Sequence, residues 1–310
     1  MFWISLACLS ACLMGIVNVF DKIIPTKYSN NYKTYPLSIG IIGLPITSVL
    51  LLIVLPFSYT SVSGLLLIII SGCLFGLHAT ILLRALYATE ASRVFPVVHT
   101  HPLFTASIAF FFLGEILSMS QWLSIVVIIT GVIIISVNPN RTSEKSGLLL
   151  KVLLPIIISS AILGTSNALL KPALESSSVL LTHAIRLIVL FILLIAFNSN
   201  KTTWLEISNW WNYKKGGLKL VVTNELIAQM ALILSVWAIS LGPVSLVSAI
   251  LSASGLITVT TVLILGKYVN SIVNEDITAA TVSFKVVGTL LIITGVIVIT
   301  LTGSGSIYSR

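Results

Sequence analysis

RALYATEASRVFPVVHTHPLFTASIAFFFLGEILSMSQWLSIVVIITGVIIIS, residues 84–136, is the segment from which the organisation of the chain can be worked out. It contains a helix ending, a turn, an apolar span with proline and histidine, the turn Leu113-Gly114-Glu115 and a second apolar span. A degenerate copy covers about residues 236–300. The first copy closes with IITGVIIIS (128–136) and the second with IITGVIVIT (292–300), identical at seven of nine positions. The sequence therefore predicts two copies of one unit.

The composition indicates a membrane protein. The 310 residues are 57% hydrophobic and only 8% charged, with a mean hydropathy of +1.11, whereas soluble domains carry about 25% charged residues. The apolar runs approach the roughly 20 residues needed to cross ~30 Å of hydrocarbon. The net charge of +8 falls in loops, which favours membrane topology over nucleic-acid binding as its explanation.

Ten transmembrane helices are predicted. Helices are expected because the runs lack two-residue alternation and because lipid requires each segment to satisfy its own backbone polar groups. The predicted spans are 2–20, 35–56, 62–86, 92–113, 119–137, 150–170, 178–197, 218–241, 244–265 and 283–302. The loop 198–217 combines Trp204, Trp210, Trp211 and Tyr213 with lysines, and is interpreted as an interfacial segment.

The two halves also match at their starts. Gly15, Asn18 and Lys22 recur at the same spacing as Gly164, Asn167 and Lys171. Each half has five spans, an odd number, so the second half enters the membrane from the opposite side. The expected organisation is an all-α membrane protein with two inverted five-helix repeats, over 1–140 and 148–303. Such repeats are common in secondary transporters, with the substrate near the midplane.

A family resemblance rests on four features: a helix ending in Ala85-Leu86-Tyr87, a proline-containing fourth span, Leu113-Gly114-Glu115, and a fifth span closing on Gly-Val. Together they resemble the EamA type of the drug/metabolite transporter superfamily, over nearly the whole chain. The resemblance implies a central cavity lined mainly by spans 1, 3, 4, 6, 8 and 9, with spans 5 and 10 peripheral, and alternating access. Gly266-Lys267 replaces Gly114-Glu115 in the second copy, so the role of Glu115 is not symmetric.

Polar groups inside apolar spans are costly, and each is therefore a candidate site residue. Glu225 follows Asn224 in the eighth span, and Gln229 shares its helix face at i,i+4 spacing. A carboxylate there could accept a proton or pair with a cationic substrate. A fixed ion pair with a nearby Lys or Arg is the alternative.

The fourth span contributes two histidines. His99 and His101 lie about 200° apart on a continuous helix, so both are not expected to face the cavity squarely. His99 is favoured because it shares a face with Pro96 and Pro102. The other histidine could bond a neighbouring helix. Freed carbonyls beside the prolines are expected near the cavity.

Four further residues are substrate-binding candidates, each with a structural alternative. His78 could contact the cavity or form a helix-packing hydrogen bond. Asn18 and Asn167, the repeat-matched pair, could face the midplane or bond another helix. Arg186 could bind an anionic group or extend to the interface, and it lies three residues after His183, so that one partner could serve both.

Enzyme signatures are not found in the sequence. A Gly-rich phosphate loop, a His-Glu-x-x-His motif, a nucleophile elbow and a carboxylate set for a metal are all missing. No cofactor, metal or catalytic residue is predicted, and the chain is not expected to be an enzyme.

The loop charges bear on orientation. Basic residues follow spans 1, 3, 5, 7 and 9, which would place both termini outside the cytoplasm. The family resemblance implies both termini inside. The charge count is favoured because it is a property of this chain.

The leading hypothesis is a secondary transporter in the cell membrane, an exporter of a small metabolite such as an amino acid, with Glu225 or a histidine coupled to protons. The expected partners are the small-molecule substrate and the lipid bilayer. A nucleotide-sugar or lipid-linked-sugar translocator is the second hypothesis and predicts a basic cavity reached by Arg186 and Lys285. A membrane-embedded enzyme or non-transporting scaffold is the third and predicts no aqueous cavity. Substrate identity, transport direction, coupling ion and oligomeric state are not determined by the sequence.

Overall fold

The architecture was obtained as a computed structural model, which describes residues 2–89, 91–115, 118–136, 146–213, 215–255, 257–258, 260–261 and 279–303. Within these residues every regular element is a helix, apart from a single bridge between Thr60 and Ser177. The elements are α1 (Phe2–Tyr28), α2 (Thr34–Val54), η1 (Leu55–Phe57), α3 (Val62–Ala88), α4 (Ala91–Val98), α5 (His101–Phe112), α6 (Met119–Ser136), α7 (Ser146–Leu174), α8 (Val179–Asn198), α9 (Lys201–Tyr213), α10 (Lys215–Leu241), α11 (Val244–Leu251) and α13 (Ala279–Gly303).

Six of the described helical segments are long and apolar enough to cross a membrane. They are Phe2–Tyr28, Thr34–Phe57, Val62–Ala88, Leu154–Leu174, Val179–Asn198 and Gly216–Leu241. Shorter apolar helices cover His101–Phe112, Met119–Gly131 and Val282–Gly295. The chain is therefore a multi-pass membrane protein.

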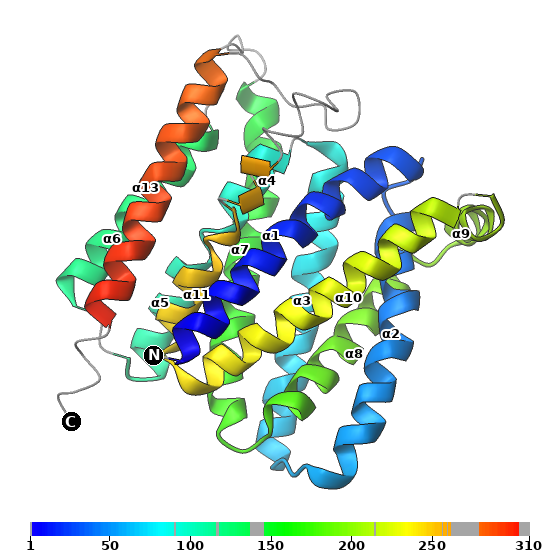
Figure 1. Cartoon of the computed structure of the whole chain (residues 1–310), viewed down its shortest axis with the longest axis horizontal. Coiled ribbons are helices and arrows are strands. Elements are labelled where there is room, and N and C mark those ends of the chain that lie inside the picture. The colour runs from blue at the N-terminus through cyan, green and yellow to red at the C-terminus, as the bar shows by residue number, and fades with distance from the viewer. Residues whose placement is uncertain are drawn as a thin grey trace.

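The helices α6 and α13 form a pair at one edge of the bundle, at the left of Figure 1. Glycines allow the two backbones to approach closely, because a Cβ atom on Gly131 would lie 2.5 Å from the carbonyl oxygen of Gly288. Small residues are the usual means of close helix packing in lipid. This peripheral placement agrees with what the family resemblance implied for the predicted spans 5 and 10.

Two other long pairs form the body of the molecule: α1 packs along α10, and α3 packs along α7 (Figure 1). A serine joins each pair through the partner's backbone. Ser10 Oγ donates to the carbonyl oxygen of Ala231 (2.7 Å), and Ser159 Oγ donates to that of His78 (3.2 Å). Residues 221 and 81 positions apart are thus brought together by the same kind of contact.

Lysines reach the ends of two of these helices. Lys22 Nζ donates to the carbonyl oxygen of Leu86 near the end of α3 (2.8 Å), and Lys171 Nζ donates to that of Ile239 near the end of α10 (3.1 Å). A cation is favourable there because the last helical carbonyls lack internal partners. Glu115 accepts hydrogen bonds at the start of α11, so it caps a helix distant in sequence.

The fourth predicted span is not one helix, which corrects the continuous span 92–113. Helix α4 ends at Val98 and α5 begins at His101. Pro102 has no N–H with which to continue the ladder to Val98. Ser160 Oγ donates instead to the Val98 carbonyl (2.9 Å), so this freed carbonyl is bonded to α7.

The ninth predicted span, 244–265, is also interrupted. Helix α11 ends at Leu251, and a turn at residues 252–253 precedes a further helical stretch. Ala253 N donates to the Ile250 carbonyl, three residues back, whereas an α-helical bond spans four residues. The remainder of this span lies largely outside the described residues.

The predicted interfacial loop 198–217 contains a helix, α9, at the right of Figure 1. Trp204 is exposed, as expected at a headgroup layer, but Trp210 is fully buried and packs edge-on against Tyr28. Trp204 therefore faces outward and Trp210 contacts α1, while the side chains of Trp211 and Tyr213 lie outside the described residues.

Candidate functional site

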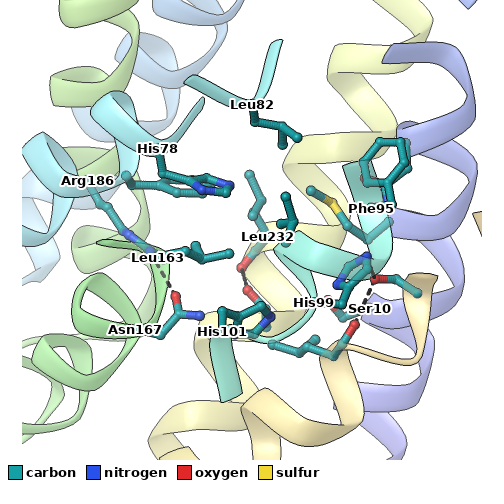
Figure 2. Close-up of a pocket in the computed structure, with 17 residues that line it drawn as sticks. Ser10, His78, Leu82, Phe95, His99, His101, Leu163, Asn167, Arg186 and Leu232 are labelled. Atoms are coloured by element: carbon teal, nitrogen blue, oxygen red, sulfur yellow. Dashed lines mark hydrogen bonds between the residues drawn. The ribbon is translucent and has the colours of Figure 1, made fainter. Parts of the chain in front are cut away.

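A cavity lies where the pairs α1–α10 and α3–α7 meet α4, α5 and α8. Figure 2 shows Arg186 and Asn167 on one side, Phe95, His99 and Ser10 on the other, and His101 between them. Its lining residues, which come from both halves of the chain, are Ser10, Met14, Asn18, Phe75, His78, Leu82, Phe95, Val98, His99, His101, Leu163, Asn167, Arg186, Leu232, Ser235, Leu251 and Ser254. The set includes six of the eight predicted site residues.

Arg186 on α8 provides the positive charge of this cavity. Its side chain is buried (3% exposed), and its Nη2 donates to Ser166 Oγ (2.9 Å) and Asn167 Oδ1 (3.0 Å). The guanidinium lies over the Phe75 ring at 4.3 Å, and its Nε has no hydrogen-bond partner. In the described part of the chain no carboxylate forms an ion pair with it. A buried guanidinium bonded only to neutral oxygens is suited to an anionic ligand.

His99 and His101 both line the cavity, which corrects the expectation that only one of them would face it. The angular estimate assumed a continuous helix, and the break after Val98 removes that assumption. The two rings are 6.2 Å apart, and the Nδ1 atom of each has no hydrogen-bond partner. His99 Nε2 lies 3.5 Å from Ser254 Oγ. Both rings therefore retain hydrogen-bonding capacity toward a ligand.

His78 combines the two roles considered for it. Its Nδ1 lies 2.8 Å from Ser159 Oγ and 3.1 Å from the Ser159 carbonyl, a contact between α3 and α7. The ring stacks on Phe75 and also lines the cavity. The packing bond fixes the orientation of a ring that a ligand could contact.

The two matched asparagines, Asn18 and Asn167, also face this cavity while bonding another group. Asn18 Nδ2 donates to Thr258 Oγ1 (3.0 Å), and Asn167 Oδ1 accepts from Arg186. Arg186 and His183 do not share a partner, because His183 Nε2 lies 3.0 Å from Gln229 Oε1.

A second cavity shares a wall with the first, through Met14, Phe75, His78, Leu82 and Leu232. Its polar residues are acidic or neutral, apart from the shared His78.

Glu225 lines this second cavity and accepts a hydrogen bond from Gln229 Nε2 (2.9 Å), which agrees with the shared helix face that the i,i+4 spacing predicted. Gln229 Nε2 also donates to Thr47 Oγ1 (2.9 Å). The alternative, an ion pair between Glu225 and a Lys or Arg, is not found among the described residues.

Asp21 and Tyr35 were missed by the sequence reasoning. Asp21 is buried in the second cavity, and its Oδ1 accepts from Tyr35 Oη (2.6 Å) and Asn224 Nδ2 (2.8 Å). The first predicted span ended at residue 20, which placed Asp21 in a loop. The signal was its position three residues after Asn18, on the same helix face.

Comparisons with known proteins bear on the family and the fold. The sequence model of the EamA-like transporter family matches residues 1–137. The uncharacterized protein MJ1333.1 of Methanocaldococcus jannaschii is 31% identical over 135 residues, which are 44% of this chain and 96% of that protein. A solved structure titled only "Crystal structure of protein" superposes with a TM-score of 0.60 at 14% identity, over 98% of each chain, and so shares the fold. The chain belongs to the EamA-like transporter family.

Proposed function

We propose that this membrane transporter moves a small amphipathic metabolite with an anionic group, such as an amino acid, by alternating access around the two adjoining cavities. The observation that carries the proposal is Arg186, a buried cation that lines the first cavity with no carboxylate partner in the described residues. Such a charge is costly in a low-dielectric interior unless a ligand of opposite charge pairs with it. The surrounding Phe75, Leu82 and Leu232 suit an apolar portion of the same molecule.

The proposed organisation remains two inverted five-helix repeats, 1–140 and 148–303. Matched contacts support it: Ser159 lies 149 positions after Ser10, and its acceptor partner His78 lies 153 positions before Ala231. In both contacts the first helix of one half donates to the third predicted span of the other.

The lysine contacts are matched as well, but each lies within one half. Lys171 lies 149 positions after Lys22, and Ile239 lies 153 positions after Leu86. The family match ends at residue 137, and the archaeal relative covers 44% of the chain, so each corresponds to about one repeat. The repeats would rock about the shared cavity.

The acidic second cavity favours an amino acid over a nucleotide sugar. Asp21 and Glu225 would repel a diphosphate, whereas the sugar-nucleotide hypothesis required a basic cavity. The side chain of Lys285, the second cation of that hypothesis, lies outside the described residues. Export, proton coupling and location in the cell membrane belong to the proposal as well.

The test is amino-acid counterflow in proteoliposomes, after a thermal-stabilisation screen to choose the solute. Arg186→Gln should lower flux by about 10-fold or more, because a hydrogen bond to a charged group contributes roughly 1.5–3 kcal/mol. Arg84→Gln is the matched control, since Arg84 lies outside the cavity and stacks on Tyr32. Full flux in Arg186→Gln, or no amino-acid flux in the unmodified protein, would contradict the proposal.

A further inference from the structure

The second cavity contains two buried acids without a basic partner. Asp21 and Glu225 are 8% and 5% exposed, and neither forms an ion pair in the described part of the chain. Their hydrogen-bond donors are neutral: Tyr35 and Asn224 for Asp21, and Gln229 for Glu225. In each carboxylate one oxygen accepts these bonds, and no donor in the described residues reaches the other. Two buried acids in this state require protons or a cationic ligand.

Asn224, which lies beside Glu225 and also lines this cavity, provides an independent observation. It is 3% exposed, and its Oδ1 has no hydrogen-bond partner. The amide orientation follows from its neighbours, because Tyr35 donates to Asp21 and therefore accepts from Asn224 Nδ2 (3.0 Å). The amide nitrogen thus faces Asp21 and Tyr35, and the oxygen is left to accept from something else.

We propose that Asp21, Asn224 and Glu225 form a second binding site, for a monovalent cation, best a primary ammonium group. Three side-chain oxygen groups match the three N–H donors of an ammonium. Apart from His78, the rest of the lining is apolar, with residues such as Leu187, Leu190 and Phe191, and suits an organic cation.

This site deepens the proposed function and rests on it in one respect. Since the two cavities share a wall, a molecule with its carboxylate at Arg186 could extend its ammonium group toward Asp21 and Glu225. A free cation such as sodium would be recognised by the same oxygens, and the experiment must distinguish these two sources.

The experiment measures thermal stabilisation of the purified full-length protein by four probes. They are L-leucine, 3-methylbutylammonium (leucine without its carboxylate), 4-methylpentanoate (leucine without its amine) and sodium. For sodium, the reference is a buffer in which N-methyl-D-glucamine replaces it. Stabilisation by either of the two amines, and not by 4-methylpentanoate, identifies an ammonium site. Stabilisation by sodium alone identifies a free-cation site.

Asp21→Asn and Glu225→Gln should each weaken the binding of whichever cation stabilises the unmodified protein, by about 10-fold or more. Glu175→Gln, which removes an exposed acid, should leave the affinity unchanged. If no cation stabilises the unmodified protein, or if both cavity variants respond as it does, the site is wrong. Cation binding without amino-acid flux would refute the transport proposal alone, and flux with unaltered cation response in both variants would refute this site alone.

Discussion

The turn after α3 and the turn after α10 are each held by a lysine, but among the described residues they differ in one carboxylate. Lys22 Nζ donates to the carbonyl oxygens of Leu86 and Thr89, both at 2.8 Å. Lys171 Nζ donates to Ile239 (3.1 Å) and Gly242 (2.9 Å). Lys171 Nζ also lies 3.5 Å from the Ser240 carbonyl oxygen. In both turns the first and last acceptors are three residues apart, so each lysine closes the same piece of backbone.

Among the described residues, a carboxylate from the opposite half contacts only the second turn, the one after α10. Glu115 accepts from Val244 N (2.8 Å), Ser245 N (3.3 Å) and Ser245 Oγ at the start of α11. The second copy has Lys267 where the first has Glu115. Lys267 lies outside the described residues, but a lysine cannot accept from helix N–H groups and carries the unfavourable charge for a helix N-terminus. The backbone plan is therefore shared, whereas a carboxylate that ties the halves is found, among the described residues, at the second turn alone.

The largest effect is expected when the lysine contacts that the two turns share are removed. Lys22→Met and Lys171→Met each remove hydrogen bonds from a charged donor to helix-end carbonyls, with a loss of about 2–3 kcal/mol. Thermal unfolding in detergent should show a lowered midpoint for both variants. Lys219→Met, at an exposed position of the same α10 helix, is the control. A neutral result for one of the two lysines would show that the turns are not equivalent.

A smaller effect is expected from the one-sided charge. Glu115→Lys gives the first copy the residue of the second and should destabilise the start of α11 by about 1–2 kcal/mol, with Glu115→Gln less affected. Hydrogen exchange of the Val244 and Ser245 amides should accelerate more in Glu115→Lys than in Glu115→Gln. Unchanged exchange in Glu115→Lys would mean that the carboxylate does not hold this turn.

The smallest effect is expected for the paired serines. Ser10→Ala removes one bond to Ala231, and Ser159→Ala removes the equivalent bond and also the contact with the His78 ring. Losses of about 0.5–1.5 kcal/mol are expected, larger for Ser159→Ala. Equal midpoints for the two variants would show that the histidine contact adds no stability.

Many of the polar residues that line the two cavities could be singled out from sequence because they are polar groups in apolar segments. The recurring Gly-Asn-Lys spacing predicted that Asn18 and Asn167 are equivalent, and both reach the first cavity. Glu225 and Gln229 were predicted to share a face and are hydrogen-bonded. The helix breaks were not predicted, and for that reason the joint placement of His99 and His101 was missed.

Composition and hydropathy were sufficient for the class of the protein, because lipid requires each apolar segment to satisfy its own backbone bonds locally. The family followed from a resemblance in short motifs such as Leu113-Gly114-Glu115. The distant partners could not be read in the same way. Asn18 bonds Thr258 across 240 positions, and Glu115 bonds Val244 across 129. Which donor meets which acceptor depends on how helices from both halves pack. Only the tertiary structure therefore showed that Asp21, Asn224 and Glu225 share one cavity and that Arg186 faces the other without a carboxylate partner in the described residues.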